Sequence, residues 1–219
     1  MRSEIKIPLN EKFNSYFNQW KDYENKVLKV YNDRLINSIY YDDENYCTAQ
    51  DNLAGITNRR KNRIRWYGSV FKNFINEIKI KKNNLGEKIS LKSNQNLLKI
   101  GNLFSFNNDF LKKEENKFFL NYINNFNLFP QVKIKYLRSY FIYKNRIRIT
   151  YDRNINYELL KNSYSVKDNT NDFMNVIELK FNPNDNLLAL ELIKNSKLVP
   201  KRFSKYLRGL YLLGVANYL

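Results

Sequence analysis

Several segments of this chain carry charged side chains at every second position, and this alternation constrains the fold more than any other feature. The longest run comprises Arg59, Lys61, Arg63 and Arg65. Successive side chains of a β-strand point to opposite faces of the sheet, so a strand over these residues has one cationic face. The alternation recurs at residues 2–7, 145–152 and 173–181, with mostly apolar residues between the charged ones. At least four strands are therefore expected to have one charged face and one apolar face.

The fold class predicted from this pattern is α+β, a mostly antiparallel β-barrel of about eight strands with helices packed on the outside. Amphipathic helices would cover the apolar strand faces, so the charged faces would point inward and line a basic cavity. Strands are expected at residues 2–7, 26–31, 34–42, 58–68, 71–81, 86–92, 131–143, 145–152 and 173–181. Helices are expected around residues 13–20, 46–47 and 111–126, after Asn182, and from Lys201 onwards. Residues 160–172 are expected to form a surface loop, and residues 1–219 a single domain.

The composition narrows the possible chemistry. The chain has 38 lysines and arginines against 21 acidic residues, a net charge of +17, which favours an anionic partner. It contains no histidine, which excludes Ser-His-Asp catalysis, Cys-His nucleophiles and zinc sites built on imidazole. Cys47 is the only cysteine, so no disulfide can form within the chain, as is typical of a reducing compartment. A phosphate chain is the polyanion that suits a cavity lined by alternating cations best.

The N-terminus shows no signal peptide, and the longest apolar stretch, around Leu210 to Val215, is too short to cross a bilayer. We therefore expect a cytoplasmic protein, with association to a membrane through a partner left open. No nucleic-acid-binding motif is visible, so a nucleic-acid partner is not expected. The oligomeric state cannot be predicted from these features.

A set of short motifs occurs in a particular order along the chain. The most distinctive is Arg63-Ile64-Arg65-Trp66-Tyr67-Gly68, and the others are Ser38-Ile39-Tyr40-Tyr41-Asp42, Asn76-Glu77-Ile78-Lys79, Gly86-Glu87-Lys88, Arg138-Ser139-Tyr140, Arg148-Ile149-Thr150-Tyr151-Asp152, Glu178-Leu179-Lys180 and Phe203-Ser204-Lys205-Tyr206. In this order they resemble the catalytic domain of the vacuolar transporter chaperone family. That family comprises polyphosphate polymerases related to the triphosphate tunnel metalloenzymes, and the resemblance extends over nearly the whole chain.

The resemblance implies an enzyme with a basic tunnel, in which the γ-phosphate of ATP is transferred onto a growing polyphosphate chain with Mn²⁺ or Mg²⁺. It implies catalytic roles for Arg63, Arg65, Arg138, Arg148 and Lys205. It implies phosphate binding by Lys6, Lys61, Lys79, Lys92, Lys180 and Arg202. Glu178 would be the metal ligand, and Glu4 either a second ligand or an internal counter-charge. ATP and inorganic polyphosphate are the expected partners.

The residues themselves are compatible with this chemistry. Phosphoryl transfer requires that phosphates are held in line and that developing charge is neutralised, which arginine and lysine achieve without a histidine base. A simpler interpretation remains for several residues, in which Glu178 only neutralises Lys180, Glu77 is a counter-charge, and Tyr40 belongs to the strand core.

Two alternative functions also remain open. One is hydrolysis of triphosphate or short polyphosphate. The first strand has only one glutamate, Glu4, where the hydrolase branch has a Glu-x-Glu-x-Lys signature, which weakens this alternative. The other is binding of polyphosphate or another polyanion without catalysis.

Overall fold

The computed structural model describes residues 2–10, 12, 14–23, 26–70, 73–82, 85–92, 121–160, 168–194 and 198–215. The chain divides into two compact units. Unit 1 comprises Met1–Leu35, Tyr136–Asn156 and Asn171–Ser204, and unit 2 comprises Ile36–Lys135, Tyr157–Thr170 and Lys205–Leu219. The expectation of a single domain stays a prediction.

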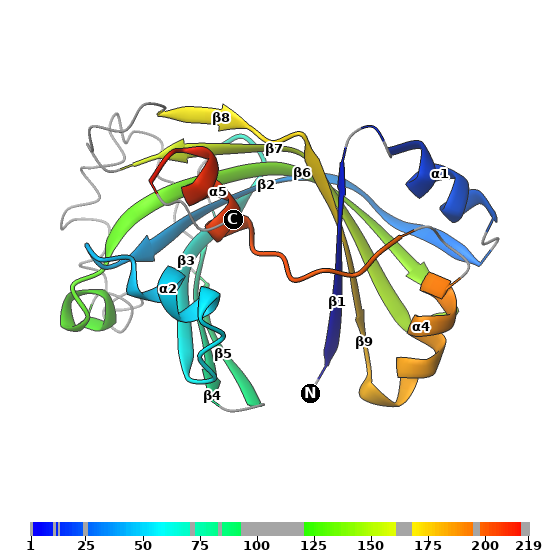
Figure 1. Ribbon diagram of the computed structural model, residues 1–219, viewed down its shortest axis with the longest axis horizontal. Coiled ribbons are helices and arrows are strands. Elements are labelled where there is room, and N and C mark those ends of the chain that lie inside the picture. Colours follow the sequence, from blue (N-terminus) through cyan, green and yellow to red (C-terminus); the bar gives the residue numbers. More distant parts are fainter. Residues whose placement is uncertain are drawn as a thin grey trace. The chain divides into compact units, whose positions relative to one another are not determined.

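The described strands form one nine-stranded sheet in the order β1-β9-β7-β6-β2-β3-β4-β5, with the short β8 paired to β7 (Figure 1). Their bounds are β1 Ser3–Asn10, β2 Val27–Asp42, β3 Arg59–Tyr67, β4 Ile75–Lys82, β5 Leu85–Lys92, β6 Phe129–Tyr143, β7 Ile147–Leu159, β8 Asn169–Asn171 and β9 Met174–Phe181. The pairings β1–β9, β7–β9, β2–β3, β3–β4 and β4–β5 are all antiparallel. The predicted α+β class with a mostly antiparallel sheet is confirmed.

The alternation in the sequence determines which side of the strands is buried in unit 1. Apolar residues of β1, β7 and β9 form one side of the core together with Phe141 and Tyr143 of β6. Helices α1 (Asn14–Tyr23) and α4 (Asn186–Lys194) cover this side (Figure 1). Phe17 of α1 stacks on Tyr151 with ring centroids 4.2 Å apart, and Trp20 donates a hydrogen bond to the carbonyl of Leu192 in α4. The charged residues of the same strands are left on the opposite face.

In unit 2 the alternating apolar residues of the strands are also buried on one side. Its core contains Ile39 and Tyr41 of β2, Ile64 and Trp66 of β3, and Ile78 of β4, with Ile123 from a helix over residues 121–125. Trp66 is buried in this core, whereas Tyr67 is exposed. The cationic positions of β3 point away from this core, because they alternate with its buried residues.

Two further helices belong to unit 2, α2 (Cys47–Leu53) and α5 (Lys205–Leu212). Gly209 of α5 lies so close to β7 that a Cβ placed there would be 2.6 Å from Cδ1 of Tyr157, so only glycine fits at this contact. In unit 1, Asn182 begins a short 3-10 helix, Pro183–Asp185, ahead of α4, and accepts a hydrogen bond from the amide of Asn184 as predicted for a cap. Among the described residues, no helix has the length and apolarity needed to span a bilayer.

Several element boundaries differ from the sequence prediction, and the largest extension is that of β7, which ends at Leu159 instead of residue 152. The two strands expected at 26–31 and 34–42 are one strand, β2, because Asp33 at the expected break is held by Arg153 of β7 and by Lys29. These contacts lower the pKa of Asp33 to about 2 although burial opposes the shift. The last helix begins at Lys205 instead of Lys201, and β8 lies within the expected loop 160–172. Leu111 and Phe118 of the expected helix 111–126 lie outside the described residues.

Candidate functional site

The cationic run of β3 forms the centre of a basic face in unit 2. In the register of the sheet, Arg63 lies opposite Tyr40 of β2 and Glu77 of β4. Lys61 lies opposite Lys79 of β4, which in turn lies opposite Lys88 of β5. Directly opposed side chains share a face and lie close together, so three lysines form a row beside Arg63. We call this surface the β3 basic face and define it by Arg59, Lys61, Arg63, Arg65, Glu77, Lys79 and Lys88.

Glu77 is the carboxylate within the β3 basic face, and it is 4% exposed. It forms ion pairs with Nε of Arg63 and with Nζ of Lys88, and one of its oxygens lies 3.9 Å from Arg65. Burial alone would raise the pKa of Glu77, but the positive charges of Arg63 and Arg65 outweigh it and lower the pKa to about 2. Glu77 is therefore ionised at neutral pH and holds the two arginines in place, which agrees with its interpretation as a counter-charge.

Tyr40 and Ser38 of β2 hold the arginines from the other side. The Arg63 guanidinium donates a hydrogen bond to the Tyr40 hydroxyl over 3.0 Å, and Nε of Arg65 donates to Ser38 Oγ over 3.3 Å. Burial would raise the pKa of Tyr40, but the charges of Arg63, Arg65 and Lys205 lower it instead. The Tyr40 hydroxyl therefore also orients Arg63, a role that the interpretation of Tyr40 as strand core did not include.

Helix α5 places the charge of Lys205 within electrostatic reach of Tyr40. Lys205 is the first residue of α5, and its charge acts on Tyr40. The next residue, Tyr206, stacks on Tyr40 with ring centroids 5.2 Å apart and an interplanar angle of 9°. The Tyr206 hydroxyl donates to Asp42 over 2.9 Å, and the Asp42 carboxylate also accepts the amides of Thr48 and Ala49 at the start of α2. The position of Lys205 therefore depends on packing that joins α5, β2 and α2.

Unit 1 carries the second charged face, on β1, β9 and β7. In its register Glu4, Lys180 and Arg148 form one cross-strand row, and Lys6, Glu178 and Thr150 form the next. The side chain of Arg138 of β6 reaches the same face, where it pairs with Asp152 of β7. We call this surface the β9 charged face and define it by Glu4, Lys6, Arg138, Arg148, Asp152, Glu178 and Lys180.

The ion pairs of the β9 charged face are buried to different depths. Arg138 binds the fully buried Asp152 through two hydrogen bonds, Nε to Oδ1 over 2.5 Å and Nη2 to Oδ2 over 2.7 Å. Burial would lower the pKa of Arg138, but the charge of Asp152 raises it well above its ordinary value. Glu178 is 7% exposed, pairs with Lys180, and lies 3.9 Å from Arg138. Asp152 therefore fixes the position of the Arg138 guanidinium group. The sequence alone assigned no role to Asp152.

Glu4 and Lys6 are the members of these two rows that belong to β1. Glu4 lies 2.9 Å from Nζ of Lys6 and 3.7 Å from Nζ of Lys180, and Lys6 also donates a hydrogen bond to the carbonyl of Phe203 over 3.3 Å. Glu4 and Glu178 therefore contact the same lysine. This geometry supports the counter-charge interpretation of both glutamates.

The oxygen atoms of the β9 charged face are the candidate ligands for the expected Mn²⁺ or Mg²⁺. No group of three His, Cys, Asp or Glu side chains within metal-binding reach occurs among the described residues. However, Thr150 Oγ1 is buried without a hydrogen-bond partner in that part of the chain, and Thr150 lies opposite Glu178 in the register. Mg²⁺ and Mn²⁺ prefer oxygen ligands, and Mg²⁺ usually takes one or two carboxylates together with substrate phosphates. Glu178, Glu4 and Thr150 fit such an ion.

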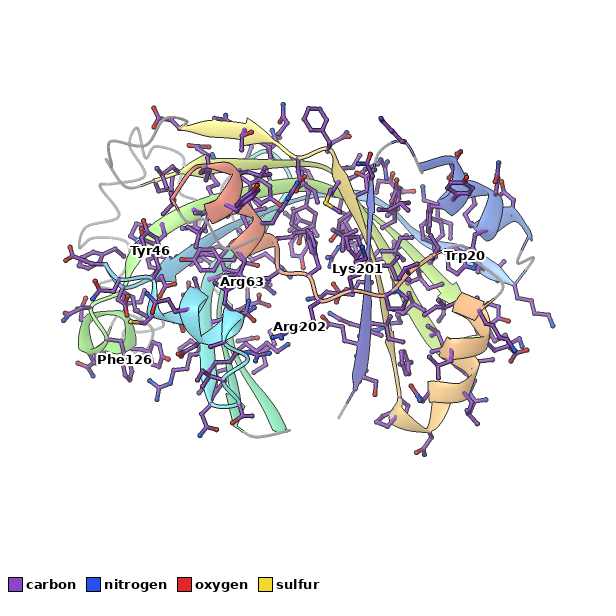
Figure 2. All side chains as sticks on the ribbon, viewed as in Figure 1. Trp20, Tyr46, Arg63, Phe126, Lys201 and Arg202 are labelled. Carbon is purple, nitrogen blue, oxygen red and sulfur yellow. The ribbon has the colours of Figure 1, made fainter. Side chains whose placement is uncertain are left out.

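The remaining predicted residues are placed less centrally. Lys79, Arg148 and Arg202 are exposed, and Arg202 lies on the segment that precedes α5 (Figure 2). Lys92 belongs to β5 opposite Ile75, but its side chain lies outside the described residues. Ser38, Lys88 and Asp152 lie beside the predicted residues without having been assigned roles. The parity of their strands was visible in the sequence, but the register that brings them to these arginines was not.

Comparison with known proteins identifies the family. The VTC domain matches residues 4–213, which is nearly the entire chain. The chain belongs to the VTC domain family. No curated protein sequence matches it. Both charged faces of this VTC-domain protein lie within the matched region.

Solved structures share the fold of this VTC-domain protein at low sequence identity. A protein of Bacillus halodurans described as a putative adenylate cyclase superimposes with a TM-score of 0.55 and 11% identity, covering 94% of this chain and 97% of that chain. The PH1819 protein of Pyrococcus horikoshii superimposes with a TM-score of 0.53 and 10% identity, covering 96% of this chain and 99% of that chain. At such identities the likeness establishes the fold alone.

Proposed function

We propose that this VTC-domain protein is a metal-dependent polyphosphate polymerase, which transfers the γ-phosphate of ATP onto a growing polyphosphate chain. The observation that carries the proposal is the β3 basic face. Six cations, Arg59, Lys61, Arg63, Arg65, Lys79 and Lys88, share it with the carboxylate of Glu77. Such an excess of positive charge on one sheet face needs an anion, and family membership points to a phosphate chain.

The contacts of Arg63 and Arg65 suit phosphoryl transfer. Glu77, Tyr40 and Ser38 fix the two guanidinium groups before any substrate arrives. Fixed donors lose little conformational entropy when they bind, so they stabilise the charge that develops during transfer more effectively than mobile lysines do. In this proposal Arg63 and Arg65 hold phosphate oxygens, while the lysine row beside them neutralises the rest of the chain.

Taken by itself, the β9 charged face of unit 1 also has groups that suit phosphate and a metal ion. Arg138, Arg148 and Lys180 would contact phosphate oxygens, and Glu178, Glu4 and Thr150 would hold Mn²⁺ or Mg²⁺. A bound metal would supply positive charge that offsets the negative charge of the phosphates. Lys180 contacts both glutamates, so it and the metal would share the same carboxylates.

An assay resolved by product tests the proposal. Purified protein is incubated with ATP and Mn²⁺, and ADP, orthophosphate, pyrophosphate and polymer are separated by gel electrophoresis and chromatography. We expect ADP and phosphate polymers of increasing length. Folded protein that makes no polymer, even with tripolyphosphate as primer, would contradict the proposal. Orthophosphate without chain growth would establish the hydrolase alternative, and tripolyphosphate binding without turnover would establish the non-catalytic one.

Three charge variants sharpen this assay. Glu178→Gln should abolish turnover while tripolyphosphate binding persists, because it removes a metal ligand and no cation. Arg63→Gln should weaken tripolyphosphate binding itself. Lys144→Gln is the matched control, because it removes the same charge from an exposed turn residue. Normal turnover by both Glu178→Gln and Arg63→Gln would refute the assignment of these residues.

A further inference from the structure

The hydroxyl group of Tyr40 lies on the β3 basic face, and only half of its hydrogen-bonding capacity is used there. Tyr40 of β2 lies directly opposite Arg63 in the register, so the two side chains share one face of the sheet. The Tyr40 oxygen accepts a hydrogen bond from the Arg63 guanidinium over 3.0 Å. A tyrosine hydroxyl can also donate one hydrogen bond. In the part of the chain that the structure describes, no group accepts the Tyr40 proton.

Tyr206 shows how a tyrosine hydroxyl in unit 2 is satisfied when it is buried. It donates to the Asp42 carboxylate over 2.9 Å, and its residue is only 2% exposed. Tyr40, in contrast, is half-buried, so part of its surface is open to a ligand. The Tyr40 proton is therefore available to an acceptor that binds on the β3 basic face.

The ring of Tyr40 is held by contacts on β3 and α5. It stacks on the ring of Tyr206, with centroids 5.2 Å apart and an interplanar angle of 9°. The guanidinium carbon of Arg63 lies 5.8 Å from the Tyr40 centroid. These contacts restrict the ring before a ligand arrives. A donor that is already ordered loses little conformational entropy on binding.

The charges around Tyr40 favour an anionic acceptor. Burial would raise the pKa of Tyr40, but the positive charges of Arg63, Arg65 and Lys205 lower it. The nearby carboxylate, Glu77, is engaged in ion pairs with Arg63 and Lys88. Cations around a hydroxyl group make it a stronger hydrogen-bond donor and repel a cationic ligand. Hydrogen bonds to an ionised acceptor are also stronger than those between neutral groups.

From these contacts we propose that Tyr40 is a further substrate-contacting residue of the β3 basic face. Its hydroxyl donates a hydrogen bond to a phosphate oxygen while it accepts one from Arg63. Because the Arg63 nitrogen and the Tyr40 oxygen are only 3.0 Å apart, both residues can contact the same phosphate group. This inference rests on the phosphate binding that the proposed function assigns to this face, but not on polymer formation.

Removal of the hydroxyl group alone tests the contact. Tyr40→Phe keeps the ring that stacks on Tyr206, and tripolyphosphate binding is measured by calorimetry. We expect the dissociation constant to rise by about 10- to 150-fold, the range for a hydrogen bond to a charged group. Tyr41→Phe is the matched control, because Tyr41 is the next residue of β2 and is buried in the core on the opposite face. Equal affinities of Tyr40→Phe and the wild type would overturn the proposal.

A double variant separates direct contact from positioning of Arg63. The Tyr40 hydroxyl also orients Arg63, so its loss can weaken binding indirectly. The comparison is therefore repeated with Arg63→Met, in which no guanidinium remains to be oriented. We expect Arg63→Met/Tyr40→Phe to bind tripolyphosphate more weakly than Arg63→Met does. Equal affinities of these two variants would show that Tyr40 acts only through Arg63, which contradicts a direct contact.

Chemical modification of the hydroxyl group gives a measurement on the unaltered chain. N-Acetylimidazole acetylates tyrosine oxygens, and mass spectrometry of peptides locates the modified residues. We expect tripolyphosphate to slow the acetylation of Tyr40 and to leave that of Tyr31, which is 59% exposed in unit 1, unchanged. An unmodified Tyr40 in the free protein would show that its hydroxyl is inaccessible. Either this result or an equal rate with saturating tripolyphosphate would contradict the proposal.

These measurements distinguish this inference from the proposed function. Wild-type protein that binds no tripolyphosphate would overturn both. Wild-type protein that binds it as tightly as Tyr40→Phe does would overturn the role of Tyr40 alone. Binding that depends on Tyr40, in a protein that makes no polymer from ATP, would support the contact and overturn only the polymerase activity.

Discussion

At the scale of a single residue, the carboxylate of Glu77 offsets part of the positive charge of the β3 basic face. Its folded-state pKa of about 2 is below the ordinary value of 4.5, so it stabilises the fold at all pH values above about 4.5. This stabilisation is lost as the pH falls toward 2, where the carboxyl group becomes protonated in the folded state as well. The shift corresponds to about 3 kcal/mol at neutral pH.

We therefore expect Glu77→Gln to lower the free energy of unfolding by about 3 kcal/mol at pH 7, and by much less near pH 2. Urea denaturation of both proteins at pH 7, 5 and 3 measures the difference. Tripolyphosphate should restore part of the stability of Glu77→Gln, because it supplies the missing negative charge. A difference in stability that does not change with pH would show that Glu77 acts through packing instead of charge.

Arg138 should be more sensitive to truncation than any exposed cation of the β9 charged face. Its removal takes the guanidinium partner from the fully buried Asp152 carboxylate, and breaking a buried ion pair typically costs about 3–5 kcal/mol. We expect Arg138→Ala to unfold at markedly lower urea concentration than Arg148→Ala, since Arg148 is exposed. The double variant Arg138→Met/Asp152→Leu should recover much of the loss. If Arg138→Ala is as stable as Arg148→Ala, the Arg138–Asp152 pair is not buried in solution.

At the scale of the element, helix α5 depends on one hydroxyl group. Tyr206 connects α5 to Asp42, and Asp42 also accepts two amides at the start of α2. Burial raises the pKa of Asp42 while these hydrogen bonds oppose the shift. Because the ring of Tyr206 stacks on Tyr40, the same helix also influences the position of Arg63.

Tyr206→Phe should keep the stacking on Tyr40 and lose only the hydrogen bond to Asp42. We expect a loss of about 1.5–3 kcal/mol in the free energy of unfolding, as for hydrogen bonds to charged groups. Thermal denaturation measures this loss. Tyr211→Phe is the control, because Tyr211 lies on the same helix with 36% of its surface exposed. Equal melting temperatures of Tyr206→Phe and the wild type would show that the hydroxyl group contributes nothing.

Strand β2 shows how tertiary contacts extend an element beyond its local signals. Asn32 and Asp33, which are residue types typical of a turn, lie between the two strands that were expected at 26–31 and 34–42. The strand continues because Arg153 and Lys29 bind the Asp33 carboxylate. Local propensity therefore predicted a break that an ion pair with a distant strand removes.

At the scale of the whole molecule, the net charge of +17 makes the fold sensitive to anions. Like charges on one chain repel each other and destabilise the compact state. A ligand that binds only the folded protein stabilises it by about 2.7 kcal/mol at 100 times its dissociation constant. We expect tripolyphosphate to raise the melting temperature well above that in sodium chloride of equal ionic strength. Identical melting temperatures in the two salts would indicate screening alone, without a specific site.

Much of the fold could be predicted because its main signal is local. The alternation of charged and apolar residues in β1, β3, β7 and β9 determines which side chains share a face, whatever the strands pair with. The ordered motifs then identified the family that the match over residues 4–213 establishes. Lys61, Arg63 and Arg65 lie together on one face for this reason, as do Glu178 and Lys180.

The sequence by itself thus determined the faces of the strands, since alternation is a property of each strand alone. Only the tertiary structure decided which charges meet across strands, because the register depends on contacts between residues far apart in the chain. It placed Glu77 and Tyr40 on either side of Arg63, and Asp152 against Arg138.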